Sequence, residues 1–387
     1  MKQLLAFCKE HPFFTSYLLV YGLLQIGLIS SFGFTYAPAL FFLFFIPFTL
    51  AYFGLSSVLT TFAVPKIKIP HLPWVLLSLS FLICVTHLFW LGDLPFFKAW
   101  QAEFLSEANQ VRKMGTAGLP KWLHYASTWA LRALLPVSAL LFIQKKSKVG
   151  FFLSLFIGSF YGLMLLQKSL VLWVNLPILI YFILNRKWIS SARIILLTAC
   201  LFVAAILANN PQLHGGKNDL NQKKEVKSSS QQVSEGLVKR IFIVPGKTLG
   251  LWLKHVPKDK PYLYGRDFSL YAKLTKQKVA DYNLELYPLF YPDYAQKGIN
   301  GSVNTAHFMR AYANFGWWSL PFSAMFLALF FQFLNILYRK TEPTMAFSLQ
   351  LFPLLLLSSG SLLTLLFSGG WGLILTLLLI SARKENC

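Results

Sequence analysis

The sequence has few charged residues. Only 13% of its 387 residues are charged, about half the share of an average soluble domain, whereas 56% are hydrophobic. So few charges cannot cover the surface of a water-soluble protein of this length, and the apolar residues stand in long runs. The sequence therefore predicts a protein of the lipid bilayer.

Several catalytic signatures are also absent. The chain has no Walker A loop, no HExxH motif and no glycine-rich dinucleotide loop. Its four cysteines are scattered, without the spacing of a metal site or a disulfide framework. We therefore expect neither an ATP-driven pump nor a zinc hydrolase, and no cofactor.

The apolar runs predict an all-α polytopic membrane protein with about ten transmembrane helices, since about 20 residues cross the hydrocarbon core. The predicted spans are 13–31, 37–58, 72–91, 122–143, 149–167, 169–185, 191–208, 311–337, 345–360 and 362–381. The fifth and sixth could instead be one long bent helix, and the last two are short. No cleavage site follows the first run, which we expect to remain as a membrane helix.

The basic residues predict how the chain is threaded. With a cytoplasmic N-terminus, the inner segments and adjoining span ends carry 14 Lys and Arg against three acidic residues. This matches the positive-inside rule, and both termini are then cytoplasmic. Merging the fifth and sixth spans would move Arg186, Lys187 and Arg193 outside, so the rule favours ten spans.

Two outer segments are long. One covers 92–121, and the other covers 209–310, between the seventh and eighth helices. The larger holds 16 Lys and Arg against eight Asp and Glu, on the side where the rule expects few cations. Residues 214–235 predict a flexible linker, because they contain almost nothing apolar, and 237–310 predict an ordered part. The chain thus divides into 1–208, 209–310 and 311–387.

Three arginines of the large outer segment are candidates for an anion site. Arg240, Arg266 and Arg310 each stand among apolar residues, where a guanidinium must be paired or must bind a ligand. Arginine suits phosphate because it binds it in a bidentate manner. The alternative for any single cation is a solvated loop charge.

The approach to the eighth span contains a polar pattern. If this stretch is helical, Asn304, His307, Arg310 and Asn314 lie on one face. That face would place an imidazole beside a guanidinium. We therefore expect a polar stripe at the outer end of this span.

A second polar pattern lies on the fourth span. His124, Thr128 and Arg132 follow at intervals of four and point a cation into the membrane. Such an arginine is a functional candidate by default, although a structural pair is the alternative. Lys168 stands at the tight outer turn between the fifth and sixth spans, where snorkelling to the interface is the alternative.

Acidic residues are confined to the segments outside the predicted spans, which argues against an ion-coupled carrier. The acidic candidates of the two outer segments are Asp93, Glu103, Glu107, Asp259, Asp267, Asp281, Glu285 and Asp293. Of these, Asp93 and Glu285 are possible general bases.

The chain resembles the bacterial polysaccharide polymerases of the O-antigen polymerase (Wzy-type) family. The segment Arg240-Ile-Phe-Ile-Val-Pro resembles the Arg-rich start of the ordered part of that family's large loop. Gly265-Arg266 stands where a Gly-containing aromatic stretch recurs, and 304–316 resembles the "Tyr-x-Asn-Phe-Gly" start of the next span. Gln167-Lys168-Ser169 lies where many members have a Ser-Arg pair, with Lys here in place of Arg.

This resemblance implies transfer of a glycan from undecaprenyl diphosphate to the non-reducing end of another lipid-linked repeat unit. The site would lie at the outer face of the bacterial inner membrane, without nucleotide or protein-bound metal. The implied partners are the undecaprenyl-diphosphate-linked oligosaccharide, the bilayer and a chain-length regulator, and no nucleic acid is expected.

The residues assigned to such a site follow from these patterns and the resemblance. The diphosphate candidates are Arg240, Arg266, Arg310, Arg132 and Lys168. His307 is the first candidate for the general base that deprotonates the acceptor hydroxyl. The secondary candidates are His124, Asp93, Glu285, Asn304 and Asn314.

Three other functions stay open. An O-antigen ligase would use the same donor with lipid A-core as acceptor. A polysaccharide flippase would be expected to show internal repeats and polar residues in many spans. A membrane scaffold would use the outer cations only to bind a partner.

Overall fold

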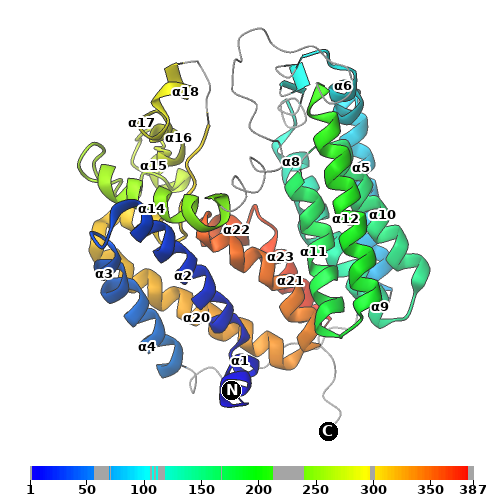
Figure 1. The fold of residues 1–387 in the computed structure, drawn as a ribbon, viewed down its shortest axis with the longest axis horizontal. Coiled ribbons are helices and arrows are strands. Elements are labelled where there is room, and N and C mark those ends of the chain that lie inside the picture. Colours follow the sequence, from blue (N-terminus) through cyan, green and yellow to red (C-terminus); the bar gives the residue numbers. More distant parts are fainter. Residues whose placement is uncertain are drawn as a thin grey trace. The chain divides into compact units, whose positions relative to one another are not determined.

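The computed structural model describes residues 2–55, 69, 71–104, 107–108, 110–111, 118–166, 168–211, 239–296 and 301–381. These residues form helices and loops, and no strand occurs among them (Figure 1). The chain divides into two compact units. Unit 1 comprises Met1–Ala63, Val226–Ile336 and Leu354–Thr364, and unit 2 comprises Val64–Glu225, Leu337–Pro353 and Leu365–Cys387.

Within the described ranges, six helical runs are long and apolar enough to cross a membrane, and the predicted all-α class is confirmed. The single helices are α2 (Pro12–Phe32), α5 (Leu72–Leu91) and α12 (Trp188–Ala208). The other three runs are continuous but composite. They are α3 (Ala37–Leu40), η1 (Phe41–Phe45) and α4 (Ile46–Gly54); α8 (Lys121–Trp129), η2 (Ala130–Leu134) and α9 (Leu135–Gln144); and α19 (Met309–Phe315), η5 (Gly316–Trp318) and α20 (Ser319–Lys340).

The other four predicted spans form shorter apolar helices. These are α10 (Lys148–Met164), α11 (Lys168–Leu184), α21 (Pro343–Leu355) with η6 (Leu356–Ser358), and the pair α22 (Leu362–Leu366) and α23 (Trp371–Ile380). α10 and α11 are separate helices packed on each other, joined through a turn in which Leu166 has a φ of 54°. The last predicted span is interrupted, because Gly370 adopts a left-handed φ of 83° before α23.

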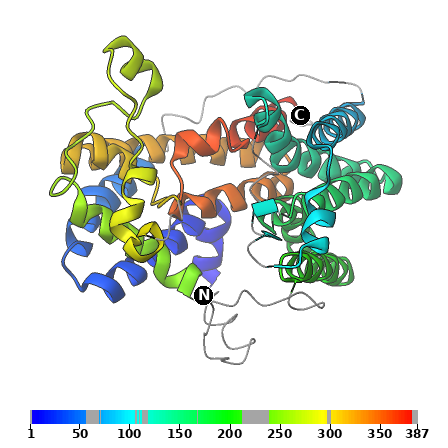
Figure 2. The same cartoon turned by 90° about the horizontal axis from the view of Figure 1, so that it is seen from above.

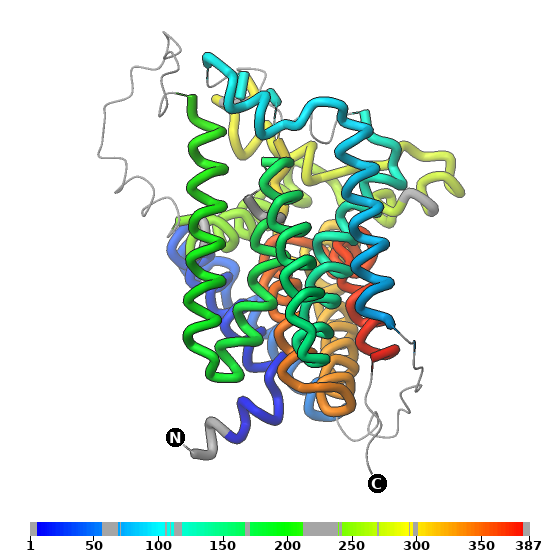
Figure 3. Tube along the Cα trace, turned by 90° about the vertical axis from the view of Figure 1, so that its right-hand side faces the viewer, coloured from blue at the N-terminus to red at the C-terminus, as the bar shows by residue number. Residues whose placement is uncertain are grey.

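Unit 2 is a helical bundle built around α9. Every residue of α9 from Leu135 to Phe142 is buried. The helices packed on it are α5, α10 and α11, and α12 packs on α11, as Figure 3 shows. The hydroxyls of Ser138 and Ser154 lie 3.0 Å apart and join α9 to α10. The small residue Gly150 lets α10 approach the ring of Phe142.

Unit 1 joins the N-terminal helices to the segment 239–296 through a close backbone contact. α14 (Val244–His255) packs along α2 (Figure 1). A Cβ atom at Gly27 would lie 2.7 Å from the Ile243 oxygen, and one at Gly246 would meet the backbone of Leu24 and Leu28. Glycine at both positions therefore permits a helix contact that a larger residue would prevent.

The rest of the segment 239–296 folds into short helices. They are η4 (Lys239–Ile243), α15 (Ser269–Leu274), α16 (Tyr282–Glu285), α17 (Tyr287–Phe290) and α18 (Pro292–Gln296). In Figure 2 the yellow helices α16 to α18 lie beside the blue N-terminal helices of unit 1. The Trp252 indole donates to the Val303 carbonyl at 3.1 Å, and the Tyr312 hydroxyl donates to the Val256 carbonyl at 2.9 Å. The predicted linker, 214–235, lies outside the described residues.

Candidate functional site

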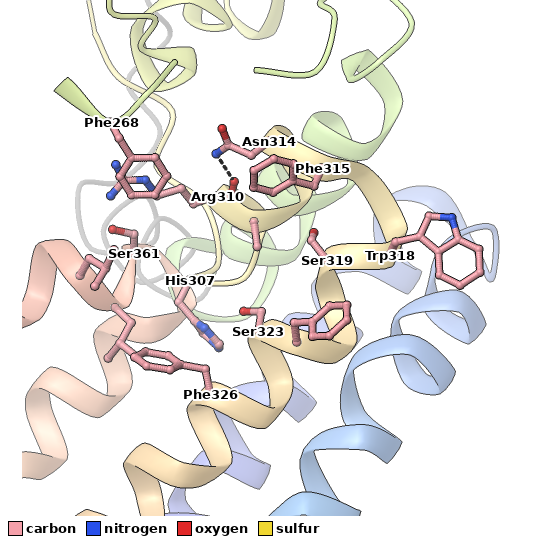
Figure 4. Close-up of a pocket in the computed structure, with 14 residues that line it drawn as sticks. Phe268, His307, Arg310, Asn314, Phe315, Trp318, Ser319, Ser323, Phe326 and Ser361 are labelled. Carbon is pink, nitrogen blue, oxygen red and sulfur yellow. Dashed lines mark hydrogen bonds between the residues drawn. The ribbon is translucent and has the colours of Figure 1, made fainter. Parts of the chain in front are cut away.

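A cavity of about 580 Å³ lies in unit 1 beside the start of α20 (Figure 4). Most of its lining is aromatic or aliphatic. The principal apolar residues are Phe268, Phe315, Trp318, Phe322, Phe326 and Leu362. Arg310, His307, Asn314 and three serines supply the polar groups at its wall. We call this space the apolar cavity.

A second cavity, of about 330 Å³, lies in the same unit and is rich in polar side chains. Its polar residues include Asp267, Asp281, Asn283, Asn304, Thr305 and Ser359. Arg310 and Ser361 line both this polar cavity and the apolar cavity. A single guanidinium therefore stands where an apolar and a polar compartment meet.

Arg310 is held by three contacts. Its Nε donates to the Asp267 carboxylate, and an Nη donates to the Asp267 carbonyl at 3.3 Å. The guanidinium carbon lies 4.2 Å from the centre of the Phe268 ring. The side chain keeps 31% of its surface exposed, against 12% for Asp267. The cation is therefore paired and oriented, yet still accessible to a ligand.

Asn314, a residue of α19, holds the loop that contains Asp267 in place. The Asn314 Oδ1 accepts from the Gly265 nitrogen at 2.7 Å, and its Nδ2 donates to the Arg310 carbonyl at 2.8 Å. The Leu263 nitrogen donates to the Ala313 carbonyl at 2.9 Å. Gly265 has a φ of 91°, a conformation that glycine adopts at little cost. Asn314 is buried, and the structure gives it a positioning role.

His307 is buried in unit 1. Its Nε2 lies 2.8 Å from the Tyr17 hydroxyl, and its backbone nitrogen donates to the Leu357 carbonyl at 2.9 Å. Burial lowers the pKa of His307 to about 3. The ring is therefore neutral at neutral pH and only weakly basic, which suits a structural contact better than proton abstraction.

The predicted polar stripe is wrong for Asn304 and His307, because α19 begins only at Met309. Residues 301–306 are not helical. The Val303 nitrogen donates to the Asn283 carbonyl at 2.8 Å. Asn304 is exposed and lines the polar cavity, so the structure still brings Asn304, His307, Arg310 and Asn314 to the two cavities by another route.

Arg266 and Glu285 have local partners. The Arg266 Nε donates to the Leu263 carbonyl at 3.1 Å, which holds the turn before Asp267. Glu285 is exposed and pairs with Lys260 at 3.0 Å. Neither residue lines the apolar or the polar cavity.

Three candidates belong to unit 2. Arg132 lies in η2 with its guanidinium carbon 4.7 Å from the Trp173 ring centre, and its Nε has no hydrogen-bond partner among the described residues. His124 is exposed on α8, and Asp93 is exposed and pairs with Lys98 at 2.5 Å. Arg132 is thus a half-buried cation stacked on an indole.

The side chains of two diphosphate candidates lie outside the described residues. Arg240 belongs to η4, and Lys168 is the first residue of α11. Their assignment to an anion site stays a prediction.

The sequence analysis did not single out Asp267 as the partner of Arg310. The two residues are 43 positions apart, so no local pattern connects them. The one available signal was chemical, because an arginine among apolar residues needs a carboxylate or another acceptor.

No protein-family model matches the chain, and neither a characterised protein nor a solved structure shows significant similarity to it. Among the residues that the structure describes, no cluster of His, Cys, Asp and Glu is arranged to hold a metal ion.

Proposed function

We propose that the protein is a membrane glycosyltransferase of the O-antigen polymerase kind. It would move a glycan from undecaprenyl diphosphate to the non-reducing end of another lipid-linked repeat unit. The observation that carries this proposal is the position of Arg310, which lines both the apolar and the polar cavity. A lipid-linked glycan has the same three parts in the same order: an apolar chain, an anionic diphosphate and a polar sugar.

The apolar cavity suits the polyprenyl chain nearest the phosphate. Its volume of about 580 Å³ is typical of small-ligand sites, which span roughly 300–1,000 Å³. Phe322 and Phe326 lie on successive turns of α20, a helix apolar enough to belong to a membrane span. A lipid tail could therefore pass from the bilayer into this cavity without crossing water.

The polar cavity suits the sugars. Asn283 and Asn304 present amides, and Thr305 presents a hydroxyl. These groups match the hydroxyls of a pyranose as donors and acceptors. Tyr282 and Trp252 add aromatic surface to the same lining.

Arg310 would act on the leaving group. When the glycosidic phosphate bond breaks, negative charge develops on the diphosphate, and a preorganised guanidinium stabilises that charge. The Asp267 ion pair and the Phe268 ring hold Arg310 in place beforehand. This arrangement requires neither nucleotide nor a metal ligand set.

The topology that accompanies this function is part of the same proposal. We infer ten spans, cytoplasmic termini and an outward-facing segment 209–310, in the inner membrane of a bacterium. The support is the excess of basic residues on the inner segments. The polar cavity and Arg310 would then lie at the outer membrane surface.

The test is replacement of Arg310 in a strain that depends on this protein for its polysaccharide. Arg310→Ala should abolish long chains while the protein level is unchanged, and Arg310→Lys should retain part of the activity. Lys273→Ala removes an exposed cation of α15 and serves as the matched control. Chain-length ladders of wild-type pattern from Arg310→Ala would contradict the proposal.

The same experiment separates a polymerase from a ligase. Loss of a polymerase leaves single repeat units attached to lipid A-core, whereas loss of a ligase leaves core without repeat units. We expect single units from Arg310→Ala cells. Bare core would move the assignment to the ligase.

A further inference from the structure

Only one of the two carboxylate oxygens of Asp267 accepts a hydrogen bond from a described residue. Its Oδ2 accepts from the Arg310 Nε. Its Oδ1 is buried and accepts no hydrogen bond from any residue that the structure describes. A buried carboxylate oxygen without a donor is desolvated at a free-energy cost, and such groups in folded proteins are often catalytic.

The free oxygen belongs to a residue of the polar cavity. Asp267 lines that cavity and not the apolar one, whereas Arg310 lines both. The hydroxyl of Thr305, from the same lining, is also buried without a described partner. Two unsatisfied polar groups in one small cavity indicate a polar ligand that supplies their hydrogen bonds.

The other acidic or basic groups near this cavity are already engaged. Asp281 is exposed, and its Oδ1 accepts from the Asn283 nitrogen at 3.0 Å as the cap of α16. Glu285 pairs with Lys260 and lines neither cavity. His307 contacts Tyr17 through Nε2.

We propose that Asp267 is the general base of the transfer, and that Arg310 controls it. This inference rests on the proposed function. Before the donor binds, Arg310 holds Asp267 in an ion pair. A diphosphate that binds Arg310 competes for the guanidinium, and the carboxylate then becomes free to accept a proton from a sugar hydroxyl.

The step balances without a further reactant. The acceptor hydroxyl gives its proton to the Asp267 carboxylate while its oxygen forms a bond to the anomeric carbon of the donor. The bond between that carbon and the phosphate oxygen breaks, and its electron pair leaves with the lipid diphosphate. The proton on Asp267 then passes to water, which restores the carboxylate.

In this mechanism the Asp267 carboxylate is freed from Arg310 only after the donor has bound. It therefore predicts an ordered reaction in which the lipid diphosphate donor binds before the acceptor is activated. It also predicts that removing the Asp267 charge raises the affinity of Arg310 for phosphate, because the carboxylate no longer competes for the guanidinium.

The decisive experiment compares Asp267→Asn with Asp293→Asn in full-length protein reconstituted in nanodiscs. Both changes remove one negative charge from unit 1, and Asp293 is an exposed residue of α18 that lines neither cavity. Turnover of a lipid-linked repeat unit and binding of undecaprenyl diphosphate are measured separately. For Asp267→Asn we expect kcat to fall by about 10²–10⁴-fold with diphosphate affinity equal to or tighter than wild type. Asp293→Asn should keep kcat within a few-fold.

Two results would overturn the inference. One is an Asp267→Asn protein that keeps wild-type kcat. The other is a loss of diphosphate affinity that accounts for the whole loss of turnover, since Asp267 would then act only as the structural partner of Arg310.

A second pair of measurements covers the case in which Asp267→Asn does not fold. The wild-type kcat should fall on acidification with a single ionisation, and Asp267→Glu should shift that limb while retaining activity. Asp267 would be ruled out as the base if kcat did not fall on acidification. It would also be ruled out if active Asp267→Glu lost kcat at the same pH as the wild type. If the wild-type protein neither binds undecaprenyl diphosphate nor extends a glycan, the proposed function fails as well. If the wild-type protein does both, a failure of the Asp267 predictions overturns only the assignment of Asp267 as the base and leaves the proposed function in place.

Discussion

The side-chain oxygen of Asn314 accepts a 2.7 Å hydrogen bond from the backbone nitrogen of Gly265. The amide of the same side chain donates to the Arg310 carbonyl. One buried neutral residue thus joins the loop before Asp267 to the helix that carries Arg310. The geometry of the ion pair depends on this link.

Replacing Asn314 with alanine should therefore damage both stability and activity. The substitution leaves the Gly265 nitrogen and the Arg310 carbonyl without their side-chain partners, a loss of about 1–3 kcal/mol for buried groups. We expect a lower thermal midpoint in detergent and reduced polysaccharide synthesis. Asn304→Ala, at an exposed position, is the control for stability. Equal midpoints for the two variants would show that the link contributes little.

The contact between α2 and α14 makes a second prediction. Gly246→Ala should destabilise unit 1 by about 1–3 kcal/mol or more, because its Cβ would meet the α2 backbone. Gly22→Ala on α2 is the matched control, since no atom lies within 4 Å of its added Cβ. Alanine at Gly22 should stabilise the helix by roughly 0.5–1 kcal/mol. Thermal unfolding of both variants measures the difference, and similar shifts would argue against the close contact.

The buried imidazole predicts a pH dependence of stability. Burial lowers the pKa of His307 to about 3, whereas an unfolded histidine has a pKa of about 6.5. The unfolded chain therefore binds the extra proton first as the pH falls. The resulting stabilisation is present above about pH 6.5 and is lost progressively toward pH 3.

The measurement compares wild type with His307→Gln, which keeps a polar group beside Tyr17. The thermal midpoint of the wild type should fall more steeply than that of the variant as the pH is lowered below about 6.5. Parallel curves would mean that His307 contributes nothing to acid sensitivity.

The apolar cavity makes a prediction about donor binding. Ser323→Trp would fill part of that cavity from α20, so KM for the lipid-linked donor should rise. Met325→Trp, two residues along α20 at an exposed position outside both linings, is the control. With donors that have a shorter polyprenyl chain, the difference in KM between the two variants should become smaller. An unchanged KM for Ser323→Trp would place the lipid elsewhere.

Much of the helical framework could be predicted from the sequence, because its signals are local. The predicted spans 13–31 and 72–91 match α2 and α5 within a residue at each end. Each of these helices has a proline in its first turn and ends beside a glycine with a positive φ, Gly33 and Gly92. The weaker predicted spans are 149–167, 169–185, 345–360 and 362–381, and these are the ones that form the shorter or interrupted helices.

The site was only partly predictable, because its decisive contacts join residues far apart in the chain. An arginine at 310 among apolar residues requires a partner, but hydropathy does not reveal that the partner is Asp267. The polar stripe failed at His307 because tertiary contacts to Leu357 and Tyr17 replaced the helical hydrogen bonds that periodicity assumes.

Unit 1 consists of three separate stretches of the chain, which are synthesised at different times. Residues 359–364, which follow α20 and α21 in the chain, contribute Ser361 to both cavities and further residues to each of them. Every other residue that lines these cavities is synthesised earlier. A nascent chain therefore carries Arg310 and Asp267 before their compartments are complete, and both linings become complete only when this late segment has been made.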